Sequence, residues 1–197
     1  DIDLPQAWDI TTGSENIIIA ILDSGIPILN GNLSHEDLLG SKIILGTDFY
    51  GDGEGVKDRN GHGTHVAGIA SASTNNSCGI AGVAPNCKLL IYQVFSETGN
   101  GSLQAFYSAV VAATDYKISN SGKKVVINFS GGGPSPSSYY TTAIEYARQN
   151  DIPIIIAAGN FDGDLEVQYP AKYSVNYNNV IAVSSTDRID KRVNTSC

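Results

Sequence analysis

Five short runs of apolar residues recur along the chain and predict the strands of a sheet. They occupy residues 17–22, 89–92, 125–127, 154–156 and 180–183. Each run is apolar throughout and rich in β-branched side chains, without alternation of polar and apolar positions. Strands have this composition when both faces of their sheet are covered, as in the parallel sheets of α/β proteins. We therefore expect a buried, mostly parallel sheet.

Helical periodicity appears between these runs. One apolar stripe has spacing i, i+3, i+4, i+7 and i+8 and consists of Leu103, Phe106, Tyr107, Val110 and Val111. A second stripe consists of Tyr140, Ala143, Ile144 and Ala147, and the small residues Ala67, Gly68, Ala70 and Ala72 predict a third, closely packed helix. Alternating strands and helices imply right-handed crossovers. The predicted fold class is α/β, a doubly wound, mostly parallel sheet with helices on both faces.

Composition narrows the classes of protein. The 197 residues suit one domain, and 42% hydrophobic residues with only 16% charged residues argue against disorder. A net charge of −8 argues against nucleic acid as a partner, because phosphate recognition needs clustered Lys and Arg. The apolar runs are far shorter than the roughly 20 residues that span a bilayer. Because the sequence contains no Met, we expect that Asp1 is not the translated start.

The three cysteines leave two interpretations open. Cys78 and Cys87 are close enough in sequence for a local disulfide, which would leave Cys197 for a partner. Alternatively, all three are small buried thiols.

Unusual polar residues follow two of the predicted strands. Ligands of a doubly wound sheet bind outside the carboxyl ends of its strands, so chemistry is expected there. Asp23 ends the first run, where a half-buried carboxylate needs a partner or caps a turn. Asn160 follows the fourth run, where its amide either donates to a developing oxyanion or forms a turn.

Two of the three histidines lie in the segment Asn-Gly-His-Gly-Thr-His-Val-Ala-Gly, residues 60–68. His62 and His65 have the i, i+3 spacing of metal ligands. The segment lacks the glutamate of a His-Glu-x-x-His site, and no other Cys/His cluster offers a third ligand. We therefore interpret His62 as a general base and His65 as a structural histidine whose hydrogen bonds are satisfied.

Four motifs in this order resemble those of the subtilisin-like serine proteases. They are Asp-Ser-Gly (23–25), the histidine segment, Ser-Gly-Gly-Gly-Pro (130–134) and Ala-Ala-Gly-Asn (157–160), and the resemblance extends over about residues 5–183. It implies that Asp23 orients the imidazole of His62, that His62 is general base and then general acid, and that Asn160 donates to the oxyanion.

The resemblance also implies a peptide-binding groove. It places one wall at Ser130, Gly131 and Gly132, a facing strand at Gly101, Ser102 and Leu103, and Asn60 on the leading side. An extended peptide would then lie as the middle strand of three. Acidic residues at 162, 164 and 166 are expected beside the first specificity pocket, where they would favour Lys or Arg. Tyr169-Pro170 resembles a turn that is often built with a cis proline.

A structural calcium ion is the cofactor that the resemblance implies. The main-chain carbonyls of Thr74, Cys78 and Ile80, the Asn76 amide and the Asp37 carboxylate would supply the oxygen ligands. This chain lacks the family's N-terminal arm, which adds a ligand, and has an enlarged loop at residues 27–34. The alternative is a polar surface hairpin without a metal.

The nucleophile is the largest departure from the family. Its Gly-Thr-Ser motif does not occur in the sequence, and only 37 residues follow Asn160. We therefore expect residues 1–197 to be the N-terminal two-thirds of one subtilisin-like peptidase domain, incomplete at the C-terminus. The leading hypothesis is a secreted serine endopeptidase of peptide or protein substrates, with a propeptide and the missing C-terminal part as further partners.

Two other functions are alternatives to this hypothesis. The first is an inactive truncated domain that binds peptide or calcium. The second, a nucleotide-binding domain, is disfavoured because no Gly-rich phosphate loop follows the first predicted strand.

Overall fold

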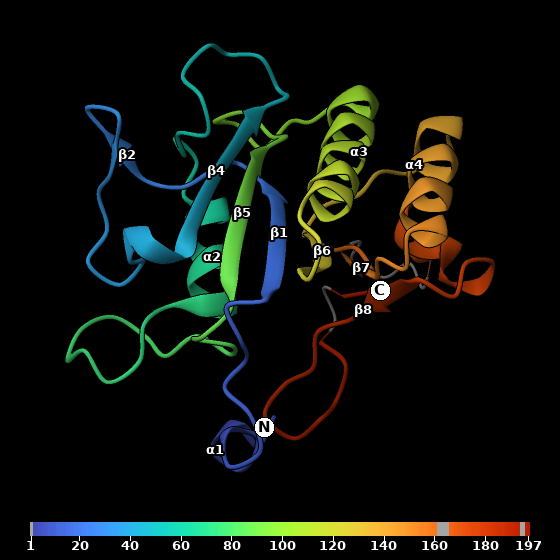
Figure 1. The fold of residues 1–197 in the computed structure, drawn as a ribbon. Helices are drawn as coiled ribbons and strands as arrows, with labels where there is room; N and C mark the ends of the chain where they lie inside the picture. Colours follow the sequence, from blue (N-terminus) through green and yellow to red (C-terminus); the bar gives the residue numbers. More distant parts are fainter. Residues whose placement is uncertain (1, 161–165, 194–195) are drawn as a thin grey trace.

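The computed structural model describes residues 2–160, 166–193 and 196–197. Its centre is a six-stranded sheet in the order β4-β5-β1-β6-β7-β8, and every neighbouring pair is parallel (Figure 1). The strands are β1 (Ile17–Asp23), β4 (Ile43–Asp48), β5 (Lys88–Gln93), β6 (Lys124–Phe129), β7 (Ile154–Ala157) and β8 (Val180–Val183). All five predicted strands are therefore confirmed, and so is the parallel α/β fold.

Three strands did not follow from the apolar pattern. The edge strand β4 is only partly buried and contains Gly46, whose missing side chain leaves room for the Tyr92 ring of β5. The short strands β2 (Ile28–Leu29) and β3 (Asn32–Leu33) form an antiparallel hairpin in the enlarged loop. Its turn residues, Asn30 and Gly31, have positive φ angles of 51° and 77°, which suit a tight two-residue hairpin turn.

Helices cover both faces of the sheet, as predicted. Helices α3 (Leu103–Ser119) and α4 (Ser138–Gln149) lie side by side over one face, where the larger apolar core forms (Figure 1). Helix α2 (His62–Ser71) packs on the other face against β1 and β5, over a smaller core. The fully buried side chains of Leu22 and Ile21, adjacent in β1, enter the first and second core respectively.

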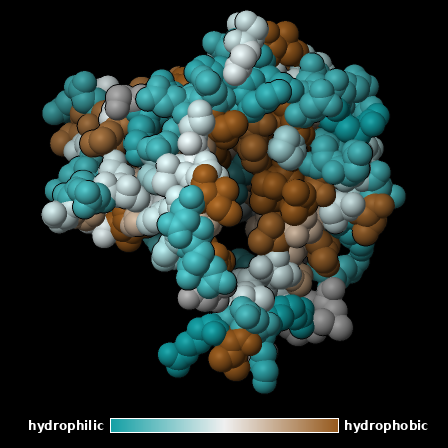
Figure 2. Space-filling model, turned by 60° about the horizontal axis from the view of Figure 1, so that its bottom comes forward, coloured by the Kyte–Doolittle hydropathy of each residue, from teal (hydrophilic) through white to brown (hydrophobic). Residues whose placement is uncertain are grey.

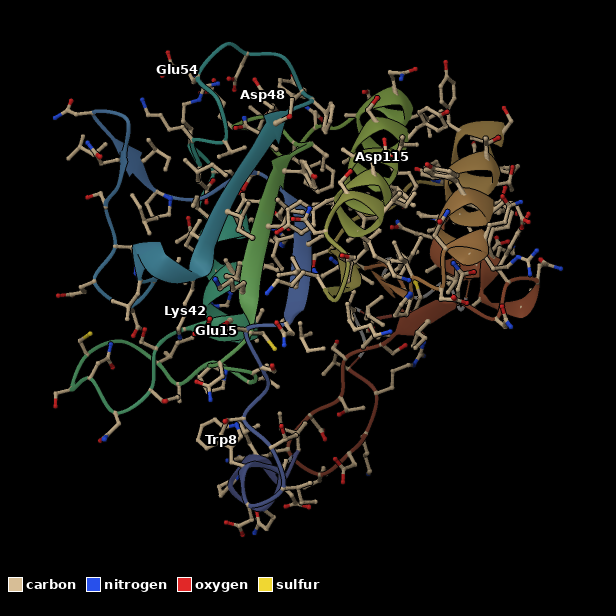
Figure 3. The ribbon with its side chains drawn as sticks, viewed as in Figure 1. Trp8, Glu15, Lys42, Asp48, Glu54 and Asp115 are labelled. Carbon is tan, nitrogen blue, oxygen red and sulfur yellow. The ribbon has the colours of Figure 1, made fainter. Side chains whose placement is uncertain are left out.

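Short helices complete the described structure. They are α1 (Leu4–Trp8) and the 3₁₀ helices η1 (Gly40–Lys42) and η2 (Ala171–Val175). The indole of Trp8 donates to the carbonyl of Val83 at 2.9 Å, which joins α1 to the segment before β5 (Figure 3). The peptide bond between Tyr169 and Pro170 is cis, as the resemblance implied.

The buried face of α3 differs from the predicted stripe. Phe106 and Val110 are buried, but Leu103 is 39% exposed. Alanines fill the rest of the interface, because Ala105, Ala109 and Ala113 are almost fully buried. Small side chains let a helix pack closely against its neighbour. The side of α3 that faces the core is therefore made of alanines as well as large apolar residues.

The sheet is less completely covered at its β8 edge. Ile181 and Val183 of β8 are 50% and 48% exposed. Apolar side chains also gather around a hollow on the face that Figure 2 presents. Within the described ranges, no helix has both the length and the apolar character needed to cross a membrane.

Candidate active site

The candidate site lies where the strand order reverses. After β1 the chain forms β4 and β5 on one side of β1, and it then crosses to form β6 on the other side. Figure 3 orients the strands: Glu15 and Lys42 precede β1 and β4 at one edge of the sheet, and Asp48 ends β4 at the other. At the end of the sheet where Asp48 lies, the carboxyl ends of β5, β1 and β6 surround a crevice. Such a crevice is the usual ligand site of doubly wound sheets.

Asp23 and His62 meet in this crevice, although 39 residues separate them. Nδ1 of His62 lies 2.7 Å from Oδ1 of Asp23. The carboxylate is fully buried, whereas the imidazole is 51% exposed. When the carboxylate is ionised it only accepts hydrogen bonds, so Nδ1 is then the donor, and in the neutral imidazole Nε2 is left as the basic nitrogen. The pair therefore has the geometry of a base held by an acid.

Burial dominates the electrostatics of Asp23. It raises the pKa of the carboxyl above its ordinary value, against the opposing effects of the His62 and Ser24 hydrogen bonds. The nearby charge of Asp58 raises the pKa further. Oδ2 of Asp23 is buried and has no hydrogen-bond partner among the residues placed in the structure. The ionised form of Asp23 thus depends on its contact with His62.

Close backbone contact between two loops brings this pair together. Gly63 follows His62 and lies against Gly25, two residues after Asp23, so closely that a Cβ at residue 63 would collide with the Gly25 carbonyl oxygen. Gly25 has a φ of 110° and in turn lies against the backbone at Val56. Both glycines are required by these contacts.

A groove runs past His62. A cavity of about 240 Å³ is lined by Asp23, Ser24, Asn60, His62, Phe95, Gly99, Ser130, Gly131 and Gly132. Asn60 spans the rim, because its Nδ2 donates to the carbonyl of Glu97 at 2.8 Å and its Oδ1 accepts from the His62 backbone at 3.2 Å. Asn60 therefore holds the leading side of the groove in place.

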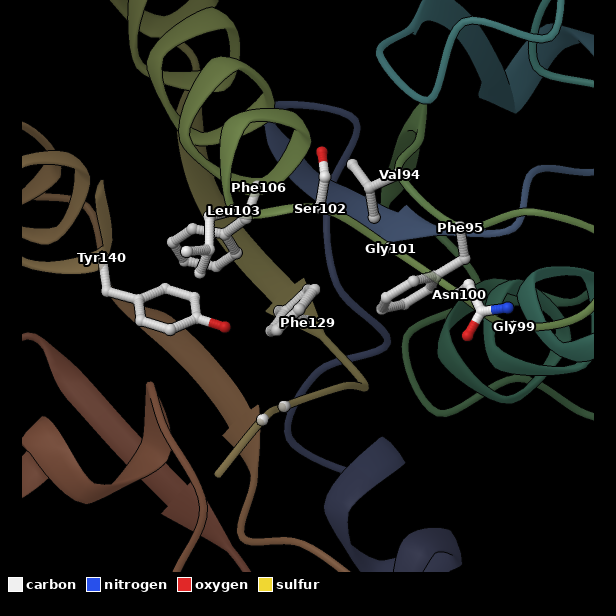
Figure 4. Close-up of a pocket in the computed structure, with 12 residues that line it drawn as sticks. Val94, Phe95, Gly99, Asn100, Gly101, Ser102, Leu103, Phe106, Phe129 and Tyr140 are labelled. Atoms are coloured by element: carbon white, nitrogen blue, oxygen red, sulfur yellow. The ribbon is translucent and has the colours of Figure 1, made fainter. Parts of the chain in front are cut away.

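The groove continues into a second cavity of about 300 Å³ (Figure 4). Aromatic rings form its interior: Phe106 contacts Phe129 at 4.8 Å and Tyr140 at 5.0 Å between centroids, while Phe95 stacks on Phe129 at 5.5 Å. Gly131 makes room for the Phe95 ring, which would overlap a side chain at that position.

The two predicted walls face this groove, with one difference from the expected strand. Gly101 forms an antiparallel bridge with Phe95. Ser102, however, caps α3 by accepting from the Ala105 N–H at 3.0 Å, and Leu103 is the first residue of that helix. Ser130, Gly131 and Gly132 follow β6 directly. Of the three residues predicted for the facing strand, only Gly101 is therefore in a strand-like pairing.

Asn160 lies on an adjoining cavity of about 240 Å³, beyond the end of β7. Ser130 lines both this cavity and the one at His62, so the two are neighbours. Asn160 is exposed, and Gly159 before it has a φ of 121°. Of the predicted acidic loop, Asp162 and Asp164 lie outside the described residues. Glu166 is exposed and pairs with Lys172.

The predicted calcium loop surrounds Asp37, which is 2% exposed. Asp37 Oδ2 accepts from the backbone of Ile80 at 2.8 Å, and Oδ1 accepts from Asn76 Nδ2 at 2.8 Å. The Ile80 hydrogen bond is the main reason that the pKa of Asp37 lies below its ordinary value. Residues 73–81 line a hollow of about 410 Å³. Ser73 Oγ is buried and has no hydrogen-bond partner in the described structure.

Two smaller predictions have clear outcomes. Cys78 and Cys87 do not form a disulfide: Cys78 Sγ lies 3.0 Å from Asn76 Nδ2, whereas Cys87 is buried beside Gly13. The interpretation of His65 as a satisfied structural histidine is wrong, because its side chain is exposed on the outer side of α2. The small residues of α2 face the sheet, and this orientation turns His65 outward.

Comparison with known proteins agrees with the fold and with the family resemblance. The subtilase family model matches residues 14–196, so the chain belongs to the subtilase family. It is 41% identical to thermitase of Thermoactinomyces vulgaris over 97% of this chain and 62% of that protein. It is 38% identical to the major intracellular serine protease of Bacillus subtilis (strain 168), over 92% of this chain and 54% of that protein.

A solved structure, sphericase, superposes with a TM-score of 0.78 and 33% identity, over 94% of this chain and 60% of that chain. The present chain thus spans about three-fifths of the length of two of these three relatives and about half of the third. The doubly wound fold and the family resemblance predicted from the sequence are confirmed.

Three residues of the site were not identified from the sequence. No motif or periodicity gave Ser24, Asp58 or Phe95 a role of its own. Asp58 lies four residues before His62. This spacing does not indicate that the two residues belong to one site unless the fold of the turn between them is known. Phe95 follows β5 directly, so the rule that sites lie at carboxyl ends of strands was a signal that could have identified it.

Proposed function

We propose that the protein is a serine endopeptidase in which Asp23 and His62 form the acid–base part of the catalytic triad. The observation that carries the proposal is the 2.7 Å contact between His62 Nδ1 and the buried Asp23 carboxylate at the floor of a groove. Membership of the subtilase family supports the same reaction class.

His62 would act through Nε2, the nitrogen that does not face Asp23. Nε2 takes the proton of a serine hydroxyl as its oxygen attacks the scissile carbonyl, and later gives this proton to the leaving amine. Asp23 stabilises the imidazolium that forms between these steps. The Asn160 amide would donate to the oxyanion of the tetrahedral intermediate. We further propose that the nucleophilic serine lies in a segment outside residues 1–197, since no Gly-Thr-Ser motif occurs in them.

The substrate would be an extended peptide. Its backbone would lie between Gly101 and residues 130–132, and one apolar side chain would enter the cavity lined by Phe106, Phe129 and Tyr140. Burial of such a side chain against aromatic rings stabilises the complex, by roughly 25 cal/mol for each Å² of apolar surface removed from water. The secretion inferred from the family resemblance stays a prediction, because one relative is by its name intracellular.

We also propose that the 74–80 loop holds a structural calcium ion. The donor set consists of hard oxygen groups that suit calcium: the Asp37 carboxylate, the Asn76 amide and the carbonyls of Thr74, Cys78 and Ile80. The hollow lined by this loop supports an additional occupant beside these donors. A half-turn of the Asn76 amide would present its oxygen, in place of the nitrogen, beside Asp37.

The proposed reaction is tested on the full-length polypeptide that contains this chain. A fluorophosphonate probe, which labels activated serines, should label that polypeptide at one serine outside residues 1–197, and peptide hydrolysis should accompany labelling. The His62→Ala variant should lose both. Chain 1–197 alone should show neither, because a base without its nucleophile does not form an acyl-enzyme. Failure of the full-length polypeptide to react, or labelling within residues 1–197 with hydrolysis, would overturn the proposal.

A further inference from the structure

Asp58 lies four residues before His62, and no role has been assigned to it above. Its carboxylate accepts five hydrogen bonds. Oδ1 accepts from Ser24 Oγ at 2.9 Å, from the Asn60 N–H at 3.0 Å and from the Gly61 N–H at 2.8 Å. Oδ2 accepts from both the backbone N–H and the hydroxyl of Thr64. About four lone-pair directions are available to a carboxylate, so Asp58 has no unused acceptor capacity.

Part of this network defines where α2 begins. The N-cap residue is Gly61, which has a φ of 95° and no side chain to accept from the first turn. The Asp58 carboxylate caps the helix instead, because it accepts hydrogen bonds from the N–H groups of Gly61 and Thr64. A negative charge at this end also interacts favourably with the helix dipole. His62 is the first residue of α2, so the cap at Asp58 fixes the base of its side chain.

Asp58 also contacts the loop of the catalytic acid. Ser24 follows Asp23 and is 2% exposed. Its backbone N–H donates to Asp23 Oδ1 at 2.7 Å, its hydroxyl donates to Asp58, and the same hydroxyl accepts from the Gly63 N–H at 2.9 Å. One carboxylate and one hydroxyl thus connect the end of β1 with the start of α2.

The protonation state of Asp58 agrees with this arrangement. Burial opposes its ionisation, yet the hydrogen bonds from Thr64, Gly61 and Ser24 together outweigh burial and hold the pKa of Asp58 below its ordinary value. The side chain is therefore an anion at neutral pH and accepts at both oxygens.

We propose that Asp58 is the positioning residue of the site, which sets the geometry of the His62–Asp23 pair by joining the α2 cap to Ser24. This inference rests on the proposed function for its catalytic meaning, but the geometry that it describes can be measured without activity. Asp58 touches neither substrate nor the reacting atoms. It acts through Ser24 and through the first turn of α2.

The spectroscopic test uses the Nδ1–H proton of His62, which gives a downfield ¹H NMR signal when it donates to a carboxylate. In chain 1–197 with labelled histidine, Asp58→Ala should abolish or broaden this signal, and Ser24→Ala should broaden it. Asp58→Asn, which keeps one acceptor oxygen, should have an intermediate effect. Asp52→Asn is the matched control, because Asp52 is also a loop carboxylate, with partners at Arg59 and Gln93 and no contact with α2.

Kinetics on the full-length polypeptide give the second measurement. Asp58→Ala should lower kcat by about 10²-fold, the effect of misplacing a catalytic group by about 1 Å, with KM little changed. Asp58→Asn should recover part of that loss. A purely structural role would lower the amount of folded enzyme and leave the kcat of the folded fraction unchanged.

The outcomes separate this inference from the proposed function. An unchanged Nδ1–H signal in folded Asp58→Ala would overturn it, whatever the activity of the wild type. If Asp58→Ala does not fold, Ser24→Ala decides, because it keeps the hydrogen bonds that Asp58 accepts from the Gly61 and Thr64 N–H groups and removes the hydroxyl that joins Asp58 to the Gly63 N–H. An unchanged signal there would overturn the inference. If the wild-type polypeptide is inactive but the variants show the predicted changes in the Nδ1–H signal, the proposed endopeptidase function is refuted. The positioning role of Asp58 is then still supported.

Discussion

Two buried aspartates of this chain, Asp23 and Asp37, have opposite electrostatics. Both are almost inaccessible to solvent, at 0% and 2% exposure. The pKa of Asp23 is raised by burial, whereas the pKa of Asp37 is lowered, mainly by the hydrogen bond from the Ile80 backbone. At Asp23 the desolvation caused by burial outweighs the hydrogen bonds from His62 and Ser24, whereas at Asp37 the hydrogen bonds from Ile80 and Asn76 outweigh the desolvation. Both oxygens of Asp37 accept from loop groups, but Oδ2 of Asp23 has no partner in the described part of the chain.

This contrast separates the carboxylate that we propose to be catalytic, Asp23, from a structural one, Asp37. Asp37 is an anion that the surrounding loop fully solvates, so its charge favours the folded state. The fold solvates the carboxylate of Asp23 incompletely, so folding disfavours its ionised form, which depends on the imidazole of His62. In the proposed mechanism this carboxylate stabilises the imidazolium that forms on His62. The predictions below test whether the two aspartates differ in this way.

The largest expected effect is the loss of activity in Asp23→Asn. The amide no longer stabilises the imidazolium and favours the wrong tautomer of His62, so kcat should fall by about 10⁴-fold in the full-length polypeptide. The raised pKa of Asp23 means that its ionised form costs stability above the unfolded pKa, so Asp23→Asn should not lower the Tm at pH 7. Steady-state kinetics and thermal melting check the two parts. A large fall in Tm with kcat retained would contradict the comparison.

A smaller loss is expected when the acid and the base are moved apart. The Cβ of Gly63→Ala would collide with the backbone of Gly25, and this must displace α2 from the loop after Asp23. We expect a fall of about 10²-fold in kcat and a destabilisation of roughly 1–3 kcal/mol. Gly40→Ala is the control, because nothing lies within 4 Å of its added Cβ. Equal behaviour of the two variants in activity and denaturant unfolding would show that the close contact is unimportant.

The sequence allowed much of the fold to be predicted because buried parallel strands are continuous apolar runs. The strands β1, β5, β6, β7 and β8 are of this kind. The partly buried edge strand β4 is not, since Gly46 interrupts it. The buried side of α3 was also misjudged, because alanines at 105, 109 and 113 define it, and alanine gives only a weak periodic signal.

The site was predictable to the extent that it depends on strand ends and motifs. Asp23 and His62 were assigned by resemblance, and the structure brings them together through the close backbone contact between Gly63 and Gly25. The role of Ser24 and Asp58 depends on how one turn folds back on the N-terminus of α2, which no periodicity encodes. Likewise, the exposure of His65 depends on the rotation of α2 about its axis.

The structural character of Asp37 predicts a pH-dependent loss of stability in Asp37→Asn. Its lowered pKa means that the carboxylate stabilises the fold above the unfolded pKa, near 3.8, and that this contribution is lost as the pH falls through the folded pKa. Removing the charged acceptor should cost about 2 kcal/mol at pH 7, the scale of a hydrogen bond to a charged group. Urea unfolding of both proteins should give curves that converge below pH 4. A constant difference across the pH range would contradict this account.

The smallest expected effect concerns calcium at the 74–80 loop, beside Asp37. If the folded chain binds the ion and the unfolded chain does not, calcium at ten times its Kd stabilises the fold by about 1.4 kcal/mol. Calcium should therefore raise the Tm of the wild type, and magnesium, which gives up its water ligands reluctantly, should do so less. Asp37→Asn should abolish the calcium effect. Thr74→Ala should retain it, because the proposed ligand is the main-chain carbonyl of Thr74. Melting that is identical with calcium and with a chelator, in folded wild-type chain, would exclude the site and leave Asp37 as an anion held by hydrogen bonds alone.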